Sequence, residues 1–183
     1  ARQGEFEEVE GAIAYPDPST KKEIVTITLV PRNKIEAISL TGNSKFSDSE
    51  IRSEFLLKSG SPFDKKMLLD ATHRVIHYYA RNGYLQTKLQ IDELPSTNGT
   101  AHLKLSLEEG APVLLADIII DTSAPFLQEK LLRTLSSFRK QILTDSLVQQ
   151  ITTAINEYLL ENHYFETSII DTNITYNSLQ TQA

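Results

Sequence analysis

Two histidines stand four residues apart in a segment whose apolar pattern predicts a helix. His73 and His77 would share one face of that helix, and Asp70 is the one carboxylate near them. This spacing is compatible with two ligands of a divalent metal ion. Both histidines lie off the apolar stripe of the helix, which favours a solvated helix face. The sequence therefore predicts neither a metal site nor a cofactor.

Neighbouring carboxylates are the other groups that could do chemistry, as a general acid and a general base. They occur as Asp64 with Asp70, Asp92 with Glu93, and Glu108 with Glu109. Paired acid–base catalysis needs a pocket that moves two pKa values apart, and the pattern places none of these pairs in one. The sequence also contains no Gly-x-Ser-x-Gly motif, no glycine-rich phosphate loop and no cysteine. We therefore expect no catalytic residues and no enzyme activity.

Composition excludes further classes of function. The 183 residues are 40% hydrophobic and 23% charged, as is usual for folded domains. The formal net charge of −6 argues against nucleic-acid binding, because neutralising phosphates requires clustered basic residues. No apolar run approaches the roughly 18 residues of a membrane-spanning helix.

The histidines belong to the segment 64–91, which predicts a helix, a stop and a strand. Leu68, Thr72, Val75 and Tyr79 recur at three- and four-residue steps, which is typical of an amphipathic helix. Gly83 stands where the end of a helix needs a left-handed residue. Apolar and polar residues then alternate up to Ile91, which predicts a strand with one buried face.

This pattern recurs 80 positions later along the chain. At that offset Gly83-Tyr84 falls on His163-Tyr164, and Phe46 falls on Phe126. A partial copy opens the chain, where Arg2-Gln3-Gly4 matches Arg81-Asn82-Gly83. The sequence therefore predicts a tandem array. Its parts are the closing hairpin of one repeat at 1–33, a complete repeat at 34–110 and a further repeat at 111–183.

Each repeat is predicted to have the order strand, helix, helix, strand, strand. In the first, a strand over 35–41 precedes a capping box at Ser47 and Glu50, and Asp64 caps the second helix. The expected fold is α+β, with a three-stranded mixed sheet and two helices on one of its faces. In the next repeat we expect a strand over 115–121 and a first helix over 123–138, with Phe126 facing inward. A second helix is expected over 144–162, and a strand is expected to begin at Tyr164. By the offset, its last strand would begin near Thr181, so this repeat is expected to lack it.

Three motifs in this order resemble the polypeptide-transport-associated (POTRA) domain. They are Leu40-Thr41-Gly42-Asn43 with Phe46, the segment 57–63, and the helix exit Tyr79-Ala80-Arg81-Asn82-Gly83-Tyr84. The later copy departs from the pattern at Thr122-Ser123 and at Asn162-His163-Tyr164. An array of more than two copies resembles the arm of BamA-like or TamA-like outer-membrane assembly proteins more than two-partner secretion transporters. The resemblance implies a periplasmic location at the outer membrane of a Gram-negative envelope and a membrane β-barrel outside this segment.

In that family the second strand of each repeat is a sheet edge, whose unpaired N–H and C=O groups can pair with another extended chain. The resemblance thus implies that the protein binds unfolded outer-membrane protein precursors and accessory lipoproteins by β-augmentation. The alternatives are a TamA-like or two-partner-secretion translocation module and a structural or divisome-type scaffold with one dedicated partner. The implied edge residues are Tyr84, Leu85, Gln86, Thr87, Lys88, Leu89, Gln90 and Ile91, and at a second edge Tyr164, Phe165, Thr167 and Ile169.

Two further expectations concern the junctions and the ends. Gly110, Ala111 and Pro112 are expected to form a hinge between repeats. The hairpin over 4–30 and the final repeat have complementary defects, so we expect that one molecule's hairpin can complete another molecule's sheet.

Overall fold

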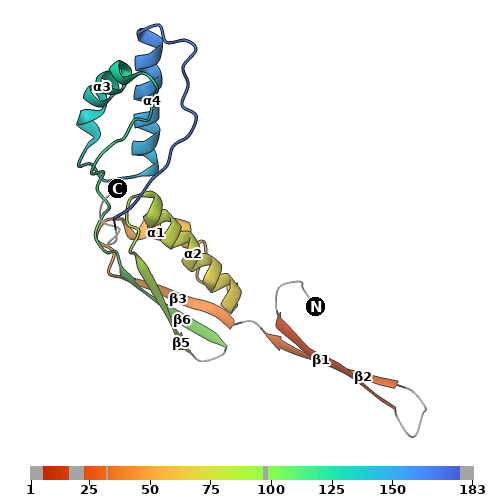
Figure 1. The fold of residues 1–183 in the computed structure, drawn as a ribbon. Coiled ribbons are helices and arrows are strands. Elements are labelled where there is room, and N and C mark those ends of the chain that lie inside the picture. The colour runs from red at the N-terminus through yellow and green to blue at the C-terminus, as the bar shows by residue number, and fades with distance from the viewer. Residues whose placement is uncertain (1–5, 17–22, 32, 97–98, 178–183) are drawn as a thin grey trace. The chain divides into compact units, whose positions relative to one another are not determined.

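The computed structural model describes residues 6–16, 23–31, 33–96 and 99–177. They form an α+β fold with a mixed sheet and helices (Figure 1). The chain divides into two compact units, the first of residues 1–75 and 89–107 and the second of residues 76–88 and 108–183.

The first unit opens with a two-stranded antiparallel sheet of β1 (Phe6–Pro16) and β2 (Glu23–Pro31). This confirms the predicted hairpin. Gly4 and residues 17–20 of the predicted turn lie outside the described residues.

A second sheet follows, in which β6 occupies an inner position. The strands are β3 (Asn33–Thr41), β4 (Pro62–Phe63), β5 (Lys88–Pro95) and β6 (Thr100–Glu108), in the order β4-β3-β6-β5. β3 runs parallel to β6 and antiparallel to β4. The prediction of three strands missed β4, because its two residues follow the breaker Ser59-Gly60-Ser61 and read as a loop. Asn98 of the predicted turn between β5 and β6 lies outside the described residues.

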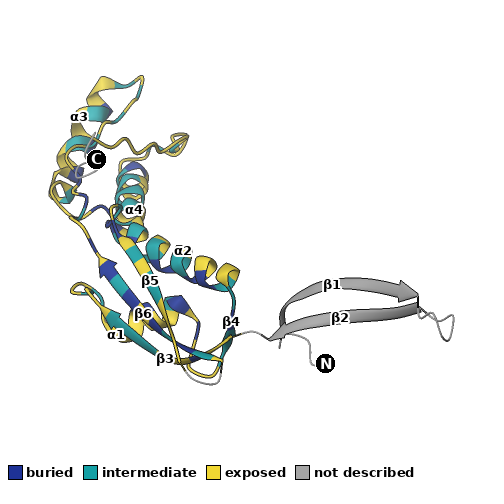
Figure 2. Cartoon of the chain, turned by 90° about the horizontal axis from the view of Figure 1, so that it is seen from below, coloured by how far each residue is buried: buried dark blue, intermediate teal, exposed yellow. Residues whose placement is uncertain are grey.

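One face of this sheet is covered, as predicted. Alternate residues of β6 are buried, from Ala101 to Leu107, whereas His102, Lys104 and Ser106 on its other face are partly or fully exposed (Figure 2). Helices α1 (Asp48–Phe55) and α2 (Lys65–Arg81) lie on the same side of the sheet (Figure 1). From residue 33 onward, the described buried apolar residues of the first unit are Ile35, Ile51, Phe55, Leu57, Phe63, Leu68, Ala71, Val75, Ala101, Leu103, Leu105 and Leu107.

Both predicted helix starts are confirmed. The Ser47 hydroxyl accepts a hydrogen bond from the Glu50 N–H, and the Glu50 carboxylate accepts one from the Ser47 N–H, which makes a capping box. The Asp64 carboxylate accepts a hydrogen bond from the Met67 N–H at the start of α2. These caps satisfy backbone donors that have no partner within the first helical turn.

The second unit contains helices α3 (Pro125–Thr134) and α4 (Asp145–Glu161), joined through the 3-10 helix η1 (Leu135–Phe138). Two small cores hold it together, one around Leu143 and Leu147 and one around Leu131 and Leu159. The prediction that Phe126 faces inward is wrong, because 57% of it is exposed beside the ring of Tyr164.

The predicted strands over 115–121 and from Tyr164 are wrong for the described residues. After Glu108 the described chain has only an isolated bridge between Leu114 and Ile142, so Tyr164, Phe165, Thr167 and Ile169 lie in no strand. At the 80-residue offset, 115–121 corresponds to β3 and the segment from Tyr164 contains the counterpart of β5. In the sheet of the first unit, β3 and β5 both pair with β6 and not with each other. The positions 80 residues after β6 begin at 180, which is outside the described residues.

Hydrogen bonds of 34–82 nevertheless recur 80 positions later. Helices α2 and α4 each have 17 residues, and they begin at 65 and 145. The backbone pair Lys34–Pro62 corresponds to the pair Leu114–Ile142. The hydrogen bond from the Gly60 N–H to the Ile35 C=O corresponds to the one from the Lys140 N–H to the Leu115 C=O, and both are 2.7 Å long. The hydrogen bond from the Thr72 hydroxyl to the Leu68 C=O corresponds to the one from the Thr152 hydroxyl to the Val148 C=O, and both are 2.9 Å long.

One of these matches generates a stability prediction. Lys140 has φ 65°, the left-handed conformation that Gly60 adopts at the matching position with φ 82°. Left-handed backbone destabilises the folded state by about 1–2 kcal/mol for a residue with a Cβ. Replacement by glycine removes this cost, but part of the gain is offset because glycine loses more conformational entropy on folding. Lys140→Gly is therefore expected to raise the free energy of unfolding by about 0.5–1 kcal/mol in urea titration. An equal or lower free energy would contradict the argument.

Candidate docking edge

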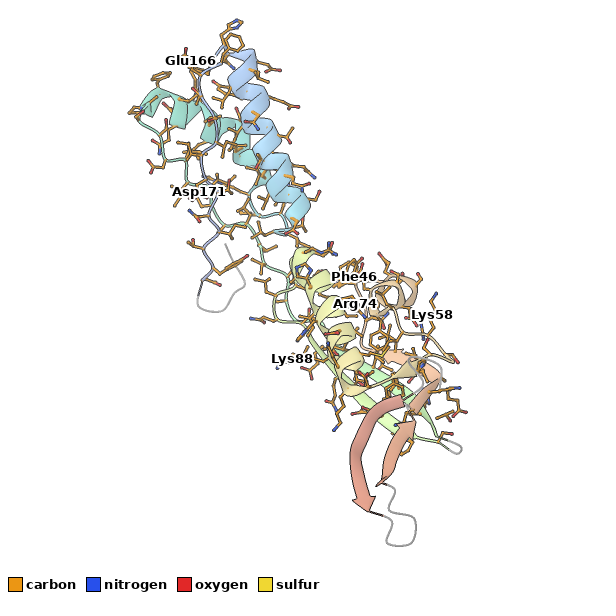
Figure 3. All side chains as sticks on the ribbon, turned by 90° about the vertical axis from the view of Figure 1, so that its right-hand side faces the viewer. Phe46, Lys58, Arg74, Lys88, Glu166 and Asp171 are labelled. Carbon is orange, nitrogen blue, oxygen red and sulfur yellow. The ribbon has the colours of Figure 1, made fainter. Side chains whose placement is uncertain are left out.

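Strand β5 is an edge of the four-stranded sheet, since β6 is its single neighbour among the described strands. Lys88 and Gln90 are exposed, whereas Leu89 and Ile91 are half-buried, so the strand presents a wet face and a packed face. The Lys88 ammonium lies 3.9 Å from the Glu108 carboxylate of β6, with both side chains exposed (Figure 3). The Gln90 amide donates to the Asp92 carboxylate at 2.8 Å.

The structure corrects half of the predicted edge. Tyr84, Leu85, Gln86 and Thr87 form the turn before β5, while the strand extends beyond Ile91 to Pro95. Tyr84 and Thr87 are buried, at 6% exposure each. The alternation of apolar and polar residues continues through this turn, which is why it reads as strand.

Buried polar groups fix the turn that leads into β5. The Thr87 hydroxyl lies 3.0 Å from the Tyr84 C=O and 2.9 Å from the Glu109 C=O. The Tyr79 hydroxyl donates to the Glu109 carboxylate at 2.9 Å, and the Tyr79 and Tyr84 rings meet edge to face. Burial and the neighbouring Glu109 carboxylate raise the pKa of the Tyr79 phenol well above its ordinary value. The beginning of the edge is thus joined to the residue that follows β6.

Gly83 allows the chain to leave α2 in this direction. Its φ is 87°, and its C=O accepts a hydrogen bond from the Val113 N–H at 2.7 Å. A Cβ at this position would lie 2.5 Å from the Ile142 Cγ2 and 2.7 Å from the Leu143 C=O oxygen. Glycine is required here both by conformation and by space.

The predicted hinge residues lie between two buried neighbours. Glu109 and Val113 are 8% and 1% exposed, whereas Gly110 and Ala111 are exposed. A Cβ on Gly110 would lie 3.0 Å from the Gln86 Cβ. Motion about Gly110, Ala111 and Pro112 stays a prediction, and the fixed neighbours would confine it to these three residues.

The candidate metal ligands lie on an exposed face of α2. His73, His77 and Asp70 are all exposed. Within the described ranges, no group of three or more His, Cys, Asp or Glu side chains is placed to hold a metal ion.

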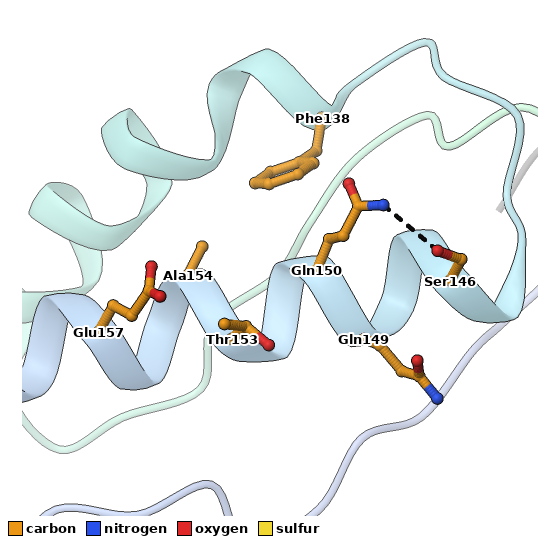
Figure 4. Close-up of a pocket in the computed structure, with 7 residues that line it drawn as sticks. All are labelled: Phe138, Ser146, Gln149, Gln150, Thr153, Ala154 and Glu157. Carbon is orange, nitrogen blue, oxygen red and sulfur yellow. Dashed lines mark hydrogen bonds between the residues drawn. The ribbon is translucent and has the colours of Figure 1, made fainter.

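The carboxylate neighbours have separate partners. Asp64 caps α2, Glu108 lies near Lys88, and Glu109 is bonded to Tyr79. An open hollow of about 410 Å³ lies beside α4, and Glu157 is the one titratable side chain in its lining (Figure 4). Acid–base catalysis would have no second group there. The lining residues are Phe138, Ser146, Gln149, Gln150, Thr153, Ala154 and Glu157.

Comparison with known proteins identifies the domain that carries this edge. The POTRA family model, described as "Surface antigen variable number repeat", matches residues 33–110. Residues 33–110 are a POTRA domain. Its sheet edge β5, its Gly83 exit and the Gly42-Asn43 turn all lie inside the matched range, so the resemblance stated from the sequence is confirmed for residues 33–110.

A longer match extends the similarity along the chain. Over 169 residues the chain is 20% identical to a putative outer membrane protein assembly factor of Treponema pallidum (strain Nichols). The match covers 92% of this chain and 20% of that protein, so the chain spans about a fifth of the relative's length.

Two solved structures are similar to this chain over most of its length. POTRA3-5 of Haemophilus influenzae BamA is 19% identical, with 85% of this chain and 66% of that chain covered and a TM-score of 0.47. The N-terminal domain of Omp85 from Thermosynechococcus elongatus is 17% identical, with 98% and 74% covered and a TM-score of 0.44. Within the part of this chain that the structure describes, no helix has the length and apolar character to cross a membrane.

The Gly83 exit of the POTRA domain generates a stability prediction. Gly83→Ala forces a Cβ into left-handed backbone and against the Leu143 main chain, so we expect a loss of about 2–4 kcal/mol in the free energy of unfolding. Gly60→Ala is the matched control, because Gly60 also has positive φ but no heavy atom within 4 Å of its Cβ position. Equal losses in both variants, measured by urea titration, would show that packing at Gly83 contributes nothing.

The Tyr79–Glu109 bond generates a pH prediction. The raised pKa of Tyr79 means that the unfolded chain loses this proton first, from a pKa near 10. Stability from this group is full below that pH and falls as pH rises above it. Tyr79→Phe should lower the free energy of unfolding by about 1–3 kcal/mol near neutral pH, because the Glu109 acceptor stays buried, and should weaken the alkaline loss. Urea titrations between pH 7 and 11 test both effects, and an unchanged alkaline slope would contradict the second.

Proposed function

We propose that this chain is part of the periplasmic arm of an outer-membrane β-barrel assembly protein, where it binds extended segments of unfolded barrel precursors at β5. The observation that carries the proposal is the position of β5 at the sheet edge with one hydrogen-bonded neighbour. An edge strand offers main-chain donors and acceptors to any extended chain. The role is binding without catalysis.

The dimensions and charges of β5 suit such a guest. Its eight residues span about 26 Å, which is most of the roughly 33 Å of a ten-residue strand of a membrane barrel. Pairing through main chain reads conformation more than sequence, which suits many different barrel precursors. Lys88 and Glu93 are exposed charges on this strand, of the kind that limit uncontrolled edge pairing.

We further propose that residues 111–183 belong to a second POTRA repeat. The support is the recurrence of hydrogen bonds 80 positions apart, from the Lys34–Pro62 pair to the helix exits. Under this proposal Tyr164, Phe165, Thr167 and Ile169 form an edge when a central strand is beside them. Accessory assembly lipoproteins, an attached membrane barrel and homo-association through the hairpin remain part of the same proposal.

Crosslinking tests the function. A photo-reactive phenylalanine analogue replaces Gln90 in the full-length protein. A barrel precursor that has been unfolded in urea is then diluted into a buffer that contains this protein, and the mixture is irradiated. The expected result is a crosslink at Gln90, and a matched probe at Gln149 on the exposed side of α4 should give none. The same crosslink with several unrelated precursors supports a general receptor. A crosslink in cells to one stoichiometric protein would instead favour a scaffold with a dedicated partner, and no crosslink would contradict β5 as the docking edge.

A further inference from the structure

The same sheet has a second border, along the side of β3 that faces away from β6. Strand β4 covers only the beginning of this border, because it pairs with Asn33 and Lys34 and then ends. Residues 36–41 of β3 have no described strand on this side. By strand order alone, an extended segment of another chain could pair antiparallel with residues 36–41 of β3, in line with β4.

Groups from the α1–β4 region occupy this border instead. The Ile35 N–H donates to the Ser61 C=O at 2.9 Å, and the Ile35 C=O accepts from the Gly60 N–H at 2.7 Å. Two side chains then continue the sequence of bonds. The Ser59 hydroxyl donates to the Glu36 C=O at 2.5 Å, and the Arg52 guanidinium donates to the Ile38 C=O at 2.8 Å.

These side chains stand where the N–H groups of a guest strand would have to come. A guanidinium donor makes a charge-assisted hydrogen bond, which is stronger than a bond between neutral groups. The helix that carries Arg52 is itself held in place, because Arg74 of α2 donates to the Glu54 and Phe55 C=O groups at the end of α1. Arg52 is therefore presented from a fixed helix.

We infer that Arg52 and Ser59 close the β3 border to extended chains, so that this sheet accepts a guest strand at β5 alone. The excluded occupant is an extended segment that would run antiparallel to β3 over residues 36–41, in line with β4. Closure would limit self-association, since a sheet with two open edges can pair with other copies at both edges and form an open-ended polymer. The β5 half of this statement rests on the proposed function, whereas the β3 half does not.

The test opens the closed border and asks where an extended chain binds. The double variant Arg52→Ala/Ser59→Ala removes both side-chain donors and leaves the capping box at Ser47 and Glu50 intact. The probe is an unlabelled peptide of about ten residues, the length of a barrel strand, that alternates valine and glutamine between terminal lysines. The measurement is the exchange broadening of backbone amide signals in NMR spectra of the full chain. Exchange broadening is largest at amides that contact the bound peptide, so it separates β3 from β5, which lie about 10 Å apart with β6 between them. The reporters are Ile38 and Leu40 for β3, and Leu89 and Ile91 for β5.

In the unmodified protein, broadening is expected at β5 and not at β3. In the double variant, Ile38 and Leu40 should broaden as well, at least two-fold above their level in the unmodified protein. The control Arg133→Ala/Ser136→Ala removes an exposed arginine and serine from α3 and η1, and should leave the β3 signals unchanged.

The possible failures are distinguishable. Broadening of Ile38 and Leu40 in the unmodified protein, or its absence in a double variant whose α2 signals are unshifted, would overturn the inference. Broadening at β3 of the double variant without any at β5 would support the inference and contradict the proposed function. A double variant whose α2 signals shift is replaced by the two single variants, with the gain expected at Glu36 for Ser59→Ala and at Ile38 for Arg52→Ala.

Discussion

The pairing of β6 with a strand on each side is the interaction on which the rest of this structure depends. β3 and β5 do not pair with each other, so β6 supplies hydrogen-bond partners to both and leaves each of them with an outer border. Its buried residues, from Ala101 to Leu107, also provide a continuous apolar face beneath the helices. The second unit shows the converse. Helices α3 and α4 are present there, but the described segments 115–121 and 164–177 form no strands.

An open border is useful only if its position is defined, and buried polar groups define it at β5. Thr87 and Glu109 join the turn before β5 to the residue after β6, and the Tyr79 hydroxyl satisfies the buried carboxylate. Polar groups buried with partners hold a specific geometry, because breaking any of these bonds leaves a desolvated group without one. The two outer borders of the sheet thus differ in construction. The beginning of β5 is fixed from within, whereas β3 is bonded along its outer side by Ser59 and Arg52.

The sequence predicted the features that depend on local periodicity and missed those that depend on distant partners. Helix α2, its Asp64 cap and the one-faced burial of β6 follow from residue spacing and capping chemistry, and all are present. The turn before β5 read as strand because its alternation matches that of a strand, and its distinguishing bond comes from Glu109, 22 residues beyond Thr87. The strand β4 was missed because two residues carry no period. The closure of β3 by Arg52 could not be seen at all, since a side chain 14 residues away reaches a main-chain oxygen.

The recurrence over 80 positions shows what the fold requires and what it leaves free. Thr144 takes the place of Asp64 and caps α4 through its hydroxyl, with the Leu147 N–H as donor at 3.0 Å. His163 takes the place of Gly83 with φ 64°, a conformation that histidine adopts more readily than most residues with a Cβ. In both cases the hydrogen bond or the dihedral angle is kept while the residue changes, so the requirement acts on backbone geometry. A glycine is demanded only where another chain segment comes close, as the Leu143 main chain does at Gly83. The segments 34–82 and 114–162 therefore keep the same backbone bonds although few of their residues are identical.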